Sequence, residues 1–214
     1  MLKQKYNSKN IKELLELTFV DLFLELNSHF MLEECPITSI LQKQLTTGES
    51  FPDAIIKHED GKRFFVEVVT ASRSKEMREN IGKQHSGLMR PNYTIRSVEN
   101  LAYITQKTVL QISDAIRKKC NKKYSNFAKI AGTEPRGILI IKFINSDVFL
   151  DEYEFKDICS RFTPSVLQAL NCGYSCFDQI FLMARVFVQD VWQEQLFRLA
   201  DLDTMEYLRL QKES

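Results

Sequence analysis

Two carboxylates on neighbouring β-rich runs are the residues whose types and spacing could do chemistry. Asp53 lies in the run Phe51 to His58, and Glu67 lies in the run Lys62 to Ala71. Only Glu59-Asp60-Gly61 separates the two runs, which is typical of a β-hairpin. The length of the hairpin loop then decides whether both carboxylates share one face of the sheet.

A three-residue loop, Glu59-Asp60-Gly61, is favoured, because its last position takes a left-handed conformation that only glycine adopts at low cost. Asp53 then faces Glu67 directly, with Cβ atoms roughly 4.5–5.5 Å apart. The alternative loop of two residues would pair Asp53 with Val68 and place the carboxylates on opposite faces. The favoured loop therefore predicts that the two acids meet.

Two like charges that face each other destabilise a sheet unless something compensates them. A divalent cation is a natural compensator, because Mg²⁺ takes one or two carboxylates together with water and phosphate oxygens. The structural alternatives are an ion pair with Arg63 or a nearby lysine, or exposure of one acid at a strand end. Glu67 lies inside the apolar run Phe64 to Val69, where a solvated acid is less expected, and both interpretations stay open.

Apolar periodicity predicts the elements that must position these acids. The expected order is helix, strand, hairpin, polar segment, helix and strand, over residues 11–30, 37–45, 51–71, 72–99, 100–124 and 137–144. We then expect a helix over 149–169 that Pro164 interrupts, a strand over 179–186 and a helical tail after Val191. This order predicts one α/β (α+β) domain, a mixed central sheet flanked by helices.

The residues around both acids resemble a known family. Phe51-Pro52-Asp53-Ala54-Ile55-Ile56, a glycine turn and Phe64-Phe65-Val66-Glu67-Val68-Val69 are similar to the core hairpin of the PD-(D/E)XK nuclease superfamily. The restriction-endonuclease-like core of that superfamily runs helix, strand, strand, strand, helix, strand. The likeness is to bacterial members with a Val-Glu-x-Val strand and a Lys-rich following helix. It implies a single domain over 1–214, with a core over about 11–144 and a C-terminal extension over about 145–214.

The resemblance also implies an activity, which is Mg²⁺- or Mn²⁺-dependent hydrolysis of phosphodiester bonds in DNA or RNA. Asp53, Glu67 and the carbonyl of Val68 would be the metal ligands. The basic residues from Arg73 to Arg96 would contact the nucleic-acid backbone. An acid from the first helix often joins this site, and Glu16 is favoured slightly over Glu25.

The chain departs from the superfamily pattern at Val69, where the motif lysine would stand. Lys119 and Lys123 extend the apolar face of the following helix, which is defined by Thr105, Val109, Ile112, Ala115 and Ile116. Either lysine could replace the missing one, or both could snorkel to solvent at the helix end. The alternative function is a catalytically degenerate nuclease-fold module that binds nucleic acid or protein.

The formal net charge of +1 over 214 residues conceals an asymmetry along the chain. Residues 107–142 carry nine Lys and Arg against two acids, whereas residues 144–214 carry six against twelve. The basic middle is compatible with contact to phosphates. The alternative is a basic helix whose charged side is simply exposed to solvent. The acidic third could bind a protein partner, and the sequence leaves a homodimer open.

The remaining features bound the class of protein. No run is apolar enough for a transmembrane helix, and the first residues lack the apolar core of a signal peptide. Five thinly spread cysteines, with Cys172 and Cys176 as buried free thiols, predict a reduced cytoplasmic protein. We therefore expect a cytoplasmic protein without a membrane partner.

Overall fold

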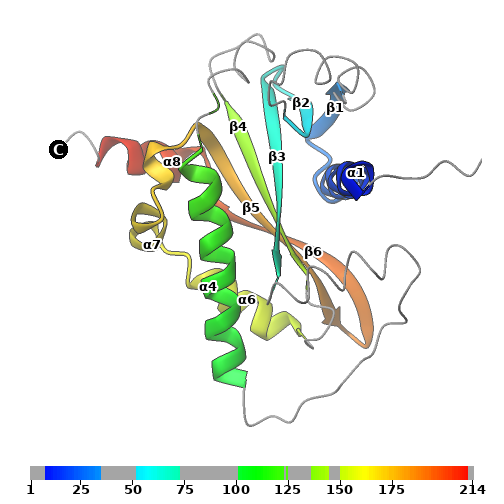
Figure 1. Cartoon of the computed structure of the whole chain (residues 1–214), viewed down its shortest axis with the longest axis vertical. Coiled ribbons are helices and arrows are strands. Elements are labelled where there is room, and N and C mark those ends of the chain that lie inside the picture. The colour runs from blue at the N-terminus through cyan, green and yellow to red at the C-terminus, as the bar shows by residue number, and fades with distance from the viewer. Residues whose placement is uncertain are drawn as a thin grey trace, which may run out of the picture. The chain divides into compact units, whose positions relative to one another are not determined.

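The computed structural model describes residues 8–34, 52–72, 101–122, 124, 136–144 and 150–211. These residues form a mixed α/β structure, and their strands make a six-stranded sheet in the order β1–β2–β3–β4–β5–β6 (Figure 1). The chain divides into two compact units, residues 1–68 with 124–139 and residues 69–123 with 140–214. The α/β class is confirmed, whereas the restriction-endonuclease-like arrangement and the single domain stay predictions.

The first unit contains one helix and a three-stranded antiparallel portion of the sheet. Its elements are α1 (Ser8–Leu26), β1 (Phe30–Glu34), β2 (Ala54–His58) and the first part of β3 (Arg63–Ser72). The helix lies beside β1 and β2 (Figure 1). The ring of Phe23 in α1 contacts Phe30 at 5.7 Å between centroids, and Phe30 contacts Phe64 at 5.8 Å. This aromatic row anchors α1 to one face of the hairpin.

The β2–β3 hairpin has the predicted register. Ile55 pairs with Phe65 and Ala54 pairs with Val66. Gly61 closes the loop with a φ of +87°, in the left-handed region. The three-residue loop is therefore confirmed, and with it the pairing on which the meeting of the two acids depends.

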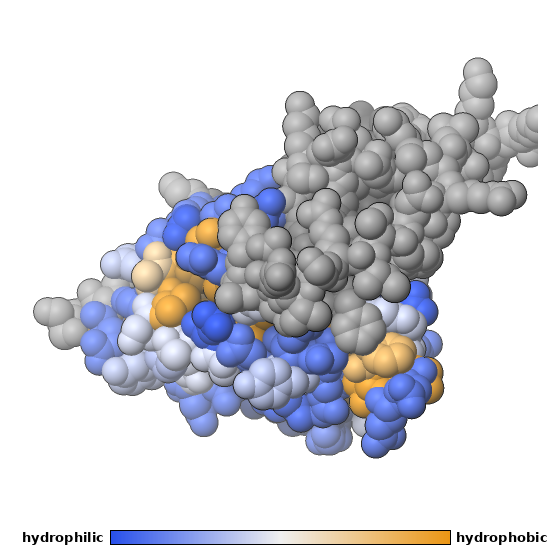
Figure 2. All heavy atoms as spheres, turned by 90° about the horizontal axis from the view of Figure 1, so that it is seen from below, coloured by the Kyte–Doolittle hydropathy of each residue, from blue (hydrophilic) through white to orange (hydrophobic). Residues whose placement is uncertain are grey.

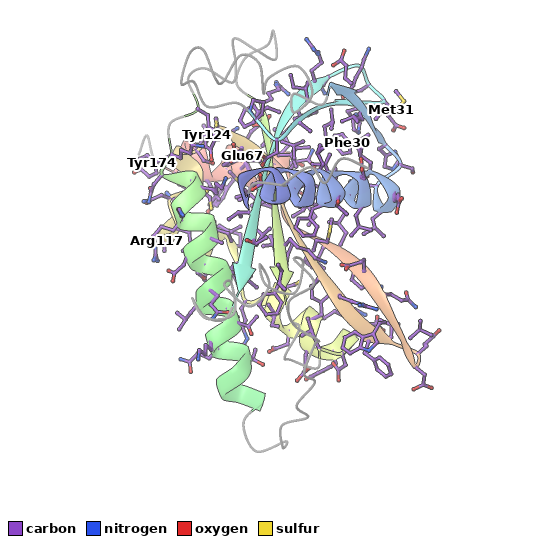
Figure 3. All side chains as sticks on the ribbon, turned by 45° about the vertical axis from the view of Figure 1, so that its right-hand side comes forward. Phe30, Met31, Glu67, Arg117, Tyr124 and Tyr174 are labelled. Carbon is purple, nitrogen blue, oxygen red and sulfur yellow. The ribbon has the colours of Figure 1, made fainter. Side chains whose placement is uncertain are left out.

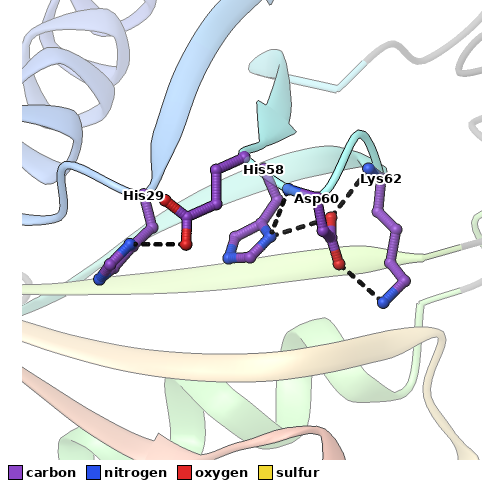
Figure 4. Close-up of polar contacts among 5 residues, drawn as sticks. His29, His58, Asp60 and Lys62 are labelled. Atoms are coloured by element: carbon purple, nitrogen blue, oxygen red, sulfur yellow. Dashed lines mark hydrogen bonds and ion pairs between the residues drawn. The ribbon is translucent and has the colours of Figure 1, made fainter.

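Polar contacts hold the tip of this hairpin (Figure 4). The carboxylate of Asp60 accepts a hydrogen bond from the backbone N–H of Lys62 at 3.0 Å and pairs with its Nζ at 2.7 Å. These bonds from Lys62 are the main reason that the pKa of Asp60 lies well below its usual range. Beside the loop, His29 contacts Glu59 at 3.1 Å. The tip is thus a local network that fixes the loop length.

The second unit contains most of the helices and a long hairpin. Its elements are α4 (Leu101–Cys120), α6 (Glu152–Ser160), α7 (Pro164–Ala169), the 3₁₀ helix η2 (Cys172–Tyr174), β5 (Phe177–Val188), β6 (Val191–Ala200) and α8 (Leu202–Leu210). Strand β4 (Gly137–Ile144), like β3, has residues in both units. Arg209 ties α8 to β5, because its guanidinium donates to the carbonyl of Phe177 at 2.6 Å and to buried Asp178 at 2.8 Å.

Several predicted boundaries are confirmed and others are wrong. The strand over 137–144 is confirmed, and Pro164 does restart a helix. The first helix ends at Leu26 instead of Phe30, because Ser28 and His29 form a turn before β1. The predicted helical tail after Val191 is wrong for Val191–Ala200, which pairs with β5 as strand β6, and is confirmed for the helix over Leu202–Leu210.

Two predicted segments cannot be compared. The strand expected over 37–45 and the basic segment from Arg73 to Arg96 lie outside the described residues. No helix within the described ranges is long and apolar enough to cross a membrane. On the face turned to the viewer in Figure 2, hydrophobic residues form separate patches among hydrophilic ones.

Candidate functional site

Asp53 ends the hairpin with both its backbone and its side chain. Its N–H donates to the carbonyl of Val66 at 2.9 Å, and its Oδ2 accepts from the N–H of Val68 at 2.6 Å. The half-buried carboxylate of Asp53 thus accepts the Val68 N–H in place of a backbone carbonyl. Because the paired register ends at Ala54 and Val66, its extension by one residue puts Asp53 across from Glu67.

Glu67 is an acid in the interior of β3. Its exposed fraction is 3%, and Phe65, two residues earlier on the same face, is fully buried. Glu67 is labelled in Figure 3. An ionised carboxylate is costly to bury unless charges or hydrogen bonds support it. Glu67 is thus a buried acid on the face of β3 that carries Phe65.

Tyr124 lies on the same face as Glu67. It is 5% exposed, and its ring stacks on Phe65 with centroids 5.7 Å apart and planes 30° apart. Its place beside the carboxylate face could not be read from periodicity, because it follows the end of α4.

The opposite face of the hairpin carries α1. Phe64 projects to that face, whereas Phe65 and Glu67 project away from it. Glu16 is half-buried and Glu25 is exposed. The aromatic contacts of α1 do not bring Glu16 to the face of Glu67, so its part in the site stays a prediction.

The predicted apolar face of α4 is confirmed by burial. Ile112, Ala115 and Ile116 are buried, Lys119 is half-buried in the last turn, and neighbouring Lys118 is exposed. Lys119 belongs to the second unit and the two carboxylates to the first, so its proposed role stays a prediction.

The end of α4 differs from its prediction. The helix ends at Cys120 rather than near Tyr124, and the side chain of the next residue, Asn121, bonds the side chain of Asn171 at 2.9 Å. Lys123 lies outside the described residues. Its proposed role in the site stays a prediction.

The donor set fits a hard cation. The Asp53 and Glu67 carboxylates and the carbonyl of Val68 are oxygen ligands of the kind that Mg²⁺ binds together with water. Among the described residues, no group of three or more His, Cys, Asp or Glu could hold a metal. A cation here would therefore depend on two acids, one carbonyl and water. Val69, at the position of the motif lysine, is half-buried and apolar.

A second buried charged residue, Lys142, lies in the second unit. No sequence pattern near it predicted its burial or its partner. Lys142 in β4 is 6% exposed and pairs with Glu194 in β6, 52 residues away. Arg185 lies across from Glu194 in the β5–β6 pairing. Burial holds the pKa of Lys142 below its usual range, although Glu194 opposes this effect. These residues form an ion-pair group that ties strands together.

The described cysteines are free thiols, as predicted for Cys172 and Cys176. Cys172 is fully buried and Cys176 is half-buried. Burial raises the pKa of the Cys159 and Cys176 thiols to about 12. Cys172 has a close neighbour in Cys120, with 3.7 Å between the Sγ atoms.

Comparisons of the chain with protein families, curated proteins and solved structures find no match. The resemblance to PD-(D/E)XK nucleases therefore stays a proposal. Support for a function must come from the carboxylate pair and the elements around it.

Proposed function

We propose that the chain is a Mg²⁺-dependent nuclease of the PD-(D/E)XK type that hydrolyses phosphodiester bonds of DNA or RNA. The observation that carries this proposal is the hairpin register, which directs Asp53 and the buried Glu67 to one face of two paired strands. Two acids on one face are the ligands that a hard cation prefers. The same cation would offset the repulsion between them.

The order of described elements supports the same proposal. Along the chain, α1, β1, β2, β3, α4 and β4 follow one another as helix, three strands, helix and strand. The two acids lie at β2 and β3, the hairpin on which the superfamily carries its metal ligands. Function does not follow from this order alone, because one fold hosts many functions.

The roles proposed for the residues follow from their contacts. Bound Mg²⁺ would lower the pKa of an attacking water and offset the charge that develops on the phosphate. Asp53 is oriented by the N–H of Val68, and the carbonyl of Val68 is the third proposed ligand. Lys119 is proposed to replace the missing lysine at position 69.

Val69 favours a second candidate function. An apolar side chain at this position can neither position a water nor neutralise a phosphate, and it is half-buried. The chain would then be a nuclease-fold module that binds nucleic acid or protein without cleaving it. The two candidates differ in whether the carboxylate pair binds a cation.

Calorimetric titration with Mn²⁺ tests the proposed site. We expect the wild type to bind Mn²⁺ and the Glu67→Gln variant to lose most of the heat of Mn²⁺ binding. The amide keeps the shape of the side chain and removes its charge. The matched control is Glu59→Gln, which removes an exposed carboxylate beside the same hairpin.

Two outcomes contradict the nuclease proposal. Unchanged Mn²⁺ heat in Glu67→Gln would place any cation elsewhere, and a wild type without heat would favour the binding module. In the second case, nucleic-acid affinity that falls steeply with salt would still support a basic binding surface. If both signals are absent, a protein-interaction role is the better account.

A further inference from the structure

Two buried thiols face each other where α4 ends and η2 begins. Cys120 is the last residue of α4 and Cys172 the first of η2, and their exposed fractions are 4% and 0%. Their Sγ atoms lie 3.7 Å apart, which is hydrogen-bond distance for sulfur and longer than the bond of about 2.05 Å in a disulfide. The structure therefore holds both cysteines as a reduced, touching pair.

The residues beside these cysteines hold the two chain segments together. Asn121 follows Cys120, Asn171 precedes Cys172, and their side chains share a hydrogen bond of 2.9 Å. Asn171 also takes the left-handed conformation, with φ at 65°, and so turns the chain into η2. The thiol contact and the neighbouring amide hydrogen bond together hold the end of α4 against the start of η2.

The surroundings also favour one thiol as the nucleophile. Hydrogen bonds from the Cys172 thiol and the Ser175 side chain lower the pKa of Cys120, although burial opposes them. The same contact, together with burial, raises the pKa of Cys172. An attacking thiolate beside a protonated thiol is the arrangement that starts thiol–disulfide exchange.

We propose that Cys120 and Cys172 form an oxidative modification site, at which a small-molecule disulfide converts the touching thiols into an intramolecular disulfide. The Cys120 thiolate attacks one sulfur of the reagent and releases the other half as a thiol, which leaves a mixed disulfide on Cys120. The Cys172 thiol then loses its proton and attacks Cys120, and the second half leaves as a thiol. The two cysteines lose two electrons and two protons, and the reagent gains both.

The test is thiol mapping of the full chain with oxidised glutathione as the probe. Folded protein is incubated with the probe, the probe is removed, and the remaining free thiols are counted by alkylation in denaturant. We expect the count to fall from the five cysteines of the sequence to three. Peptide mass spectrometry should find Cys120 linked to Cys172 in a monomer on a non-reducing gel.

Two variants make the test specific. Cys172→Ser should abolish the linked peptide, whereas Cys176→Ser, four residues along the chain, should leave it unchanged. The disulfide map of the wild type tests the proposal by itself. The result therefore does not depend on whether the Cys172→Ser protein folds. Five free thiols after treatment, or links that join other cysteines, would overturn the proposal.

Discussion

Asp53 has a structural and a proposed chemical task at once. Its Oδ2 accepts the N–H of Val68, so the carboxylate stabilises the strand that carries Glu67. The N–H of Asp53 meanwhile donates to the carbonyl of Val66. A substitution at this position can therefore change folding, cation binding or both, and the replacement residue decides which.

Asparagine and alanine at position 53 should separate these tasks. Asp53→Ala removes the acceptor of the Val68 N–H and should lower the free energy of unfolding by about 1–3 kcal/mol. Asp53→Asn keeps an oxygen acceptor and should cost less, yet both variants should lose Mn²⁺ binding. Urea unfolding and calorimetry measure the two effects.

The control for these variants is Asp21→Ala, an exposed acid of α1, which should change the free energy of unfolding by no more than about 0.5 kcal/mol. Equal destabilisation by Asp53→Ala and Asp53→Asn would show that the bond to Val68 does not carry the structural task.

At the scale of elements, the β2–β3 hairpin aligns the site through its loop. Gly61 has a φ of +87°, and a Cβ built on it would meet no atom within 4 Å. A side chain there would therefore cost backbone strain and no steric clash. A substitution at Gly61 can therefore perturb the register of β2 and β3 without changing Asp53 or Glu67.

Gly61→Ala should lower the free energy of unfolding by about 1–2 kcal/mol, because alanine is strained in the left-handed region. Gly61→Asn should cost less, since asparagine tolerates that region better than alanine. Thermal or urea unfolding of the three proteins gives the order. An alanine variant as stable as the wild type would contradict the left-handed loop and the register that depends on it.

The hairpin and the buried strand β4 could be predicted because their signals are local. A glycine stands at the only loop position that needs it, and residues 137–144 form one continuous apolar run. The apolar face of α4 followed from its helical period, and Lys119 lies on it as expected. The candidate carboxylates were therefore placed by patterns within one hairpin.

The wrong assignments depended on contacts between distant residues. Phe30 continues the apolar spacing of α1, but it is buried as a strand residue between Phe23 and Phe64. Strand β6 follows Gln189 and Asp190, which both have positive φ, and neither is the glycine that marks such turns. Pairing with β5 decides that segment, as it often does for strands.

For the whole molecule, the distribution of charge bears on the substrate. Within the described residues, Arg117 and Lys118 are exposed in the last turn of α4, where they complement the helix dipole, and Lys122 is exposed just after the helix. In the acidic third, Glu152 pairs with Lys156 within α6, and Asp157 of α6 pairs with Arg161, the residue that follows the helix. Part of the acidic charge is thus paired locally, and the basic residues of α4 stay compatible with contact to phosphates.

Cleavage is the most direct measurement of the central claim. Plasmid, single-stranded DNA and RNA would each be incubated with the wild type and with Glu67→Gln, in Mg²⁺, in Mn²⁺ and in a chelator. The account predicts that the wild type cleaves at least one substrate, and that both the chelator and Glu67→Gln lower the rate by at least about 100-fold. Cleavage that persists in Glu67→Gln, or a wild type that cleaves none of the substrates, would contradict it.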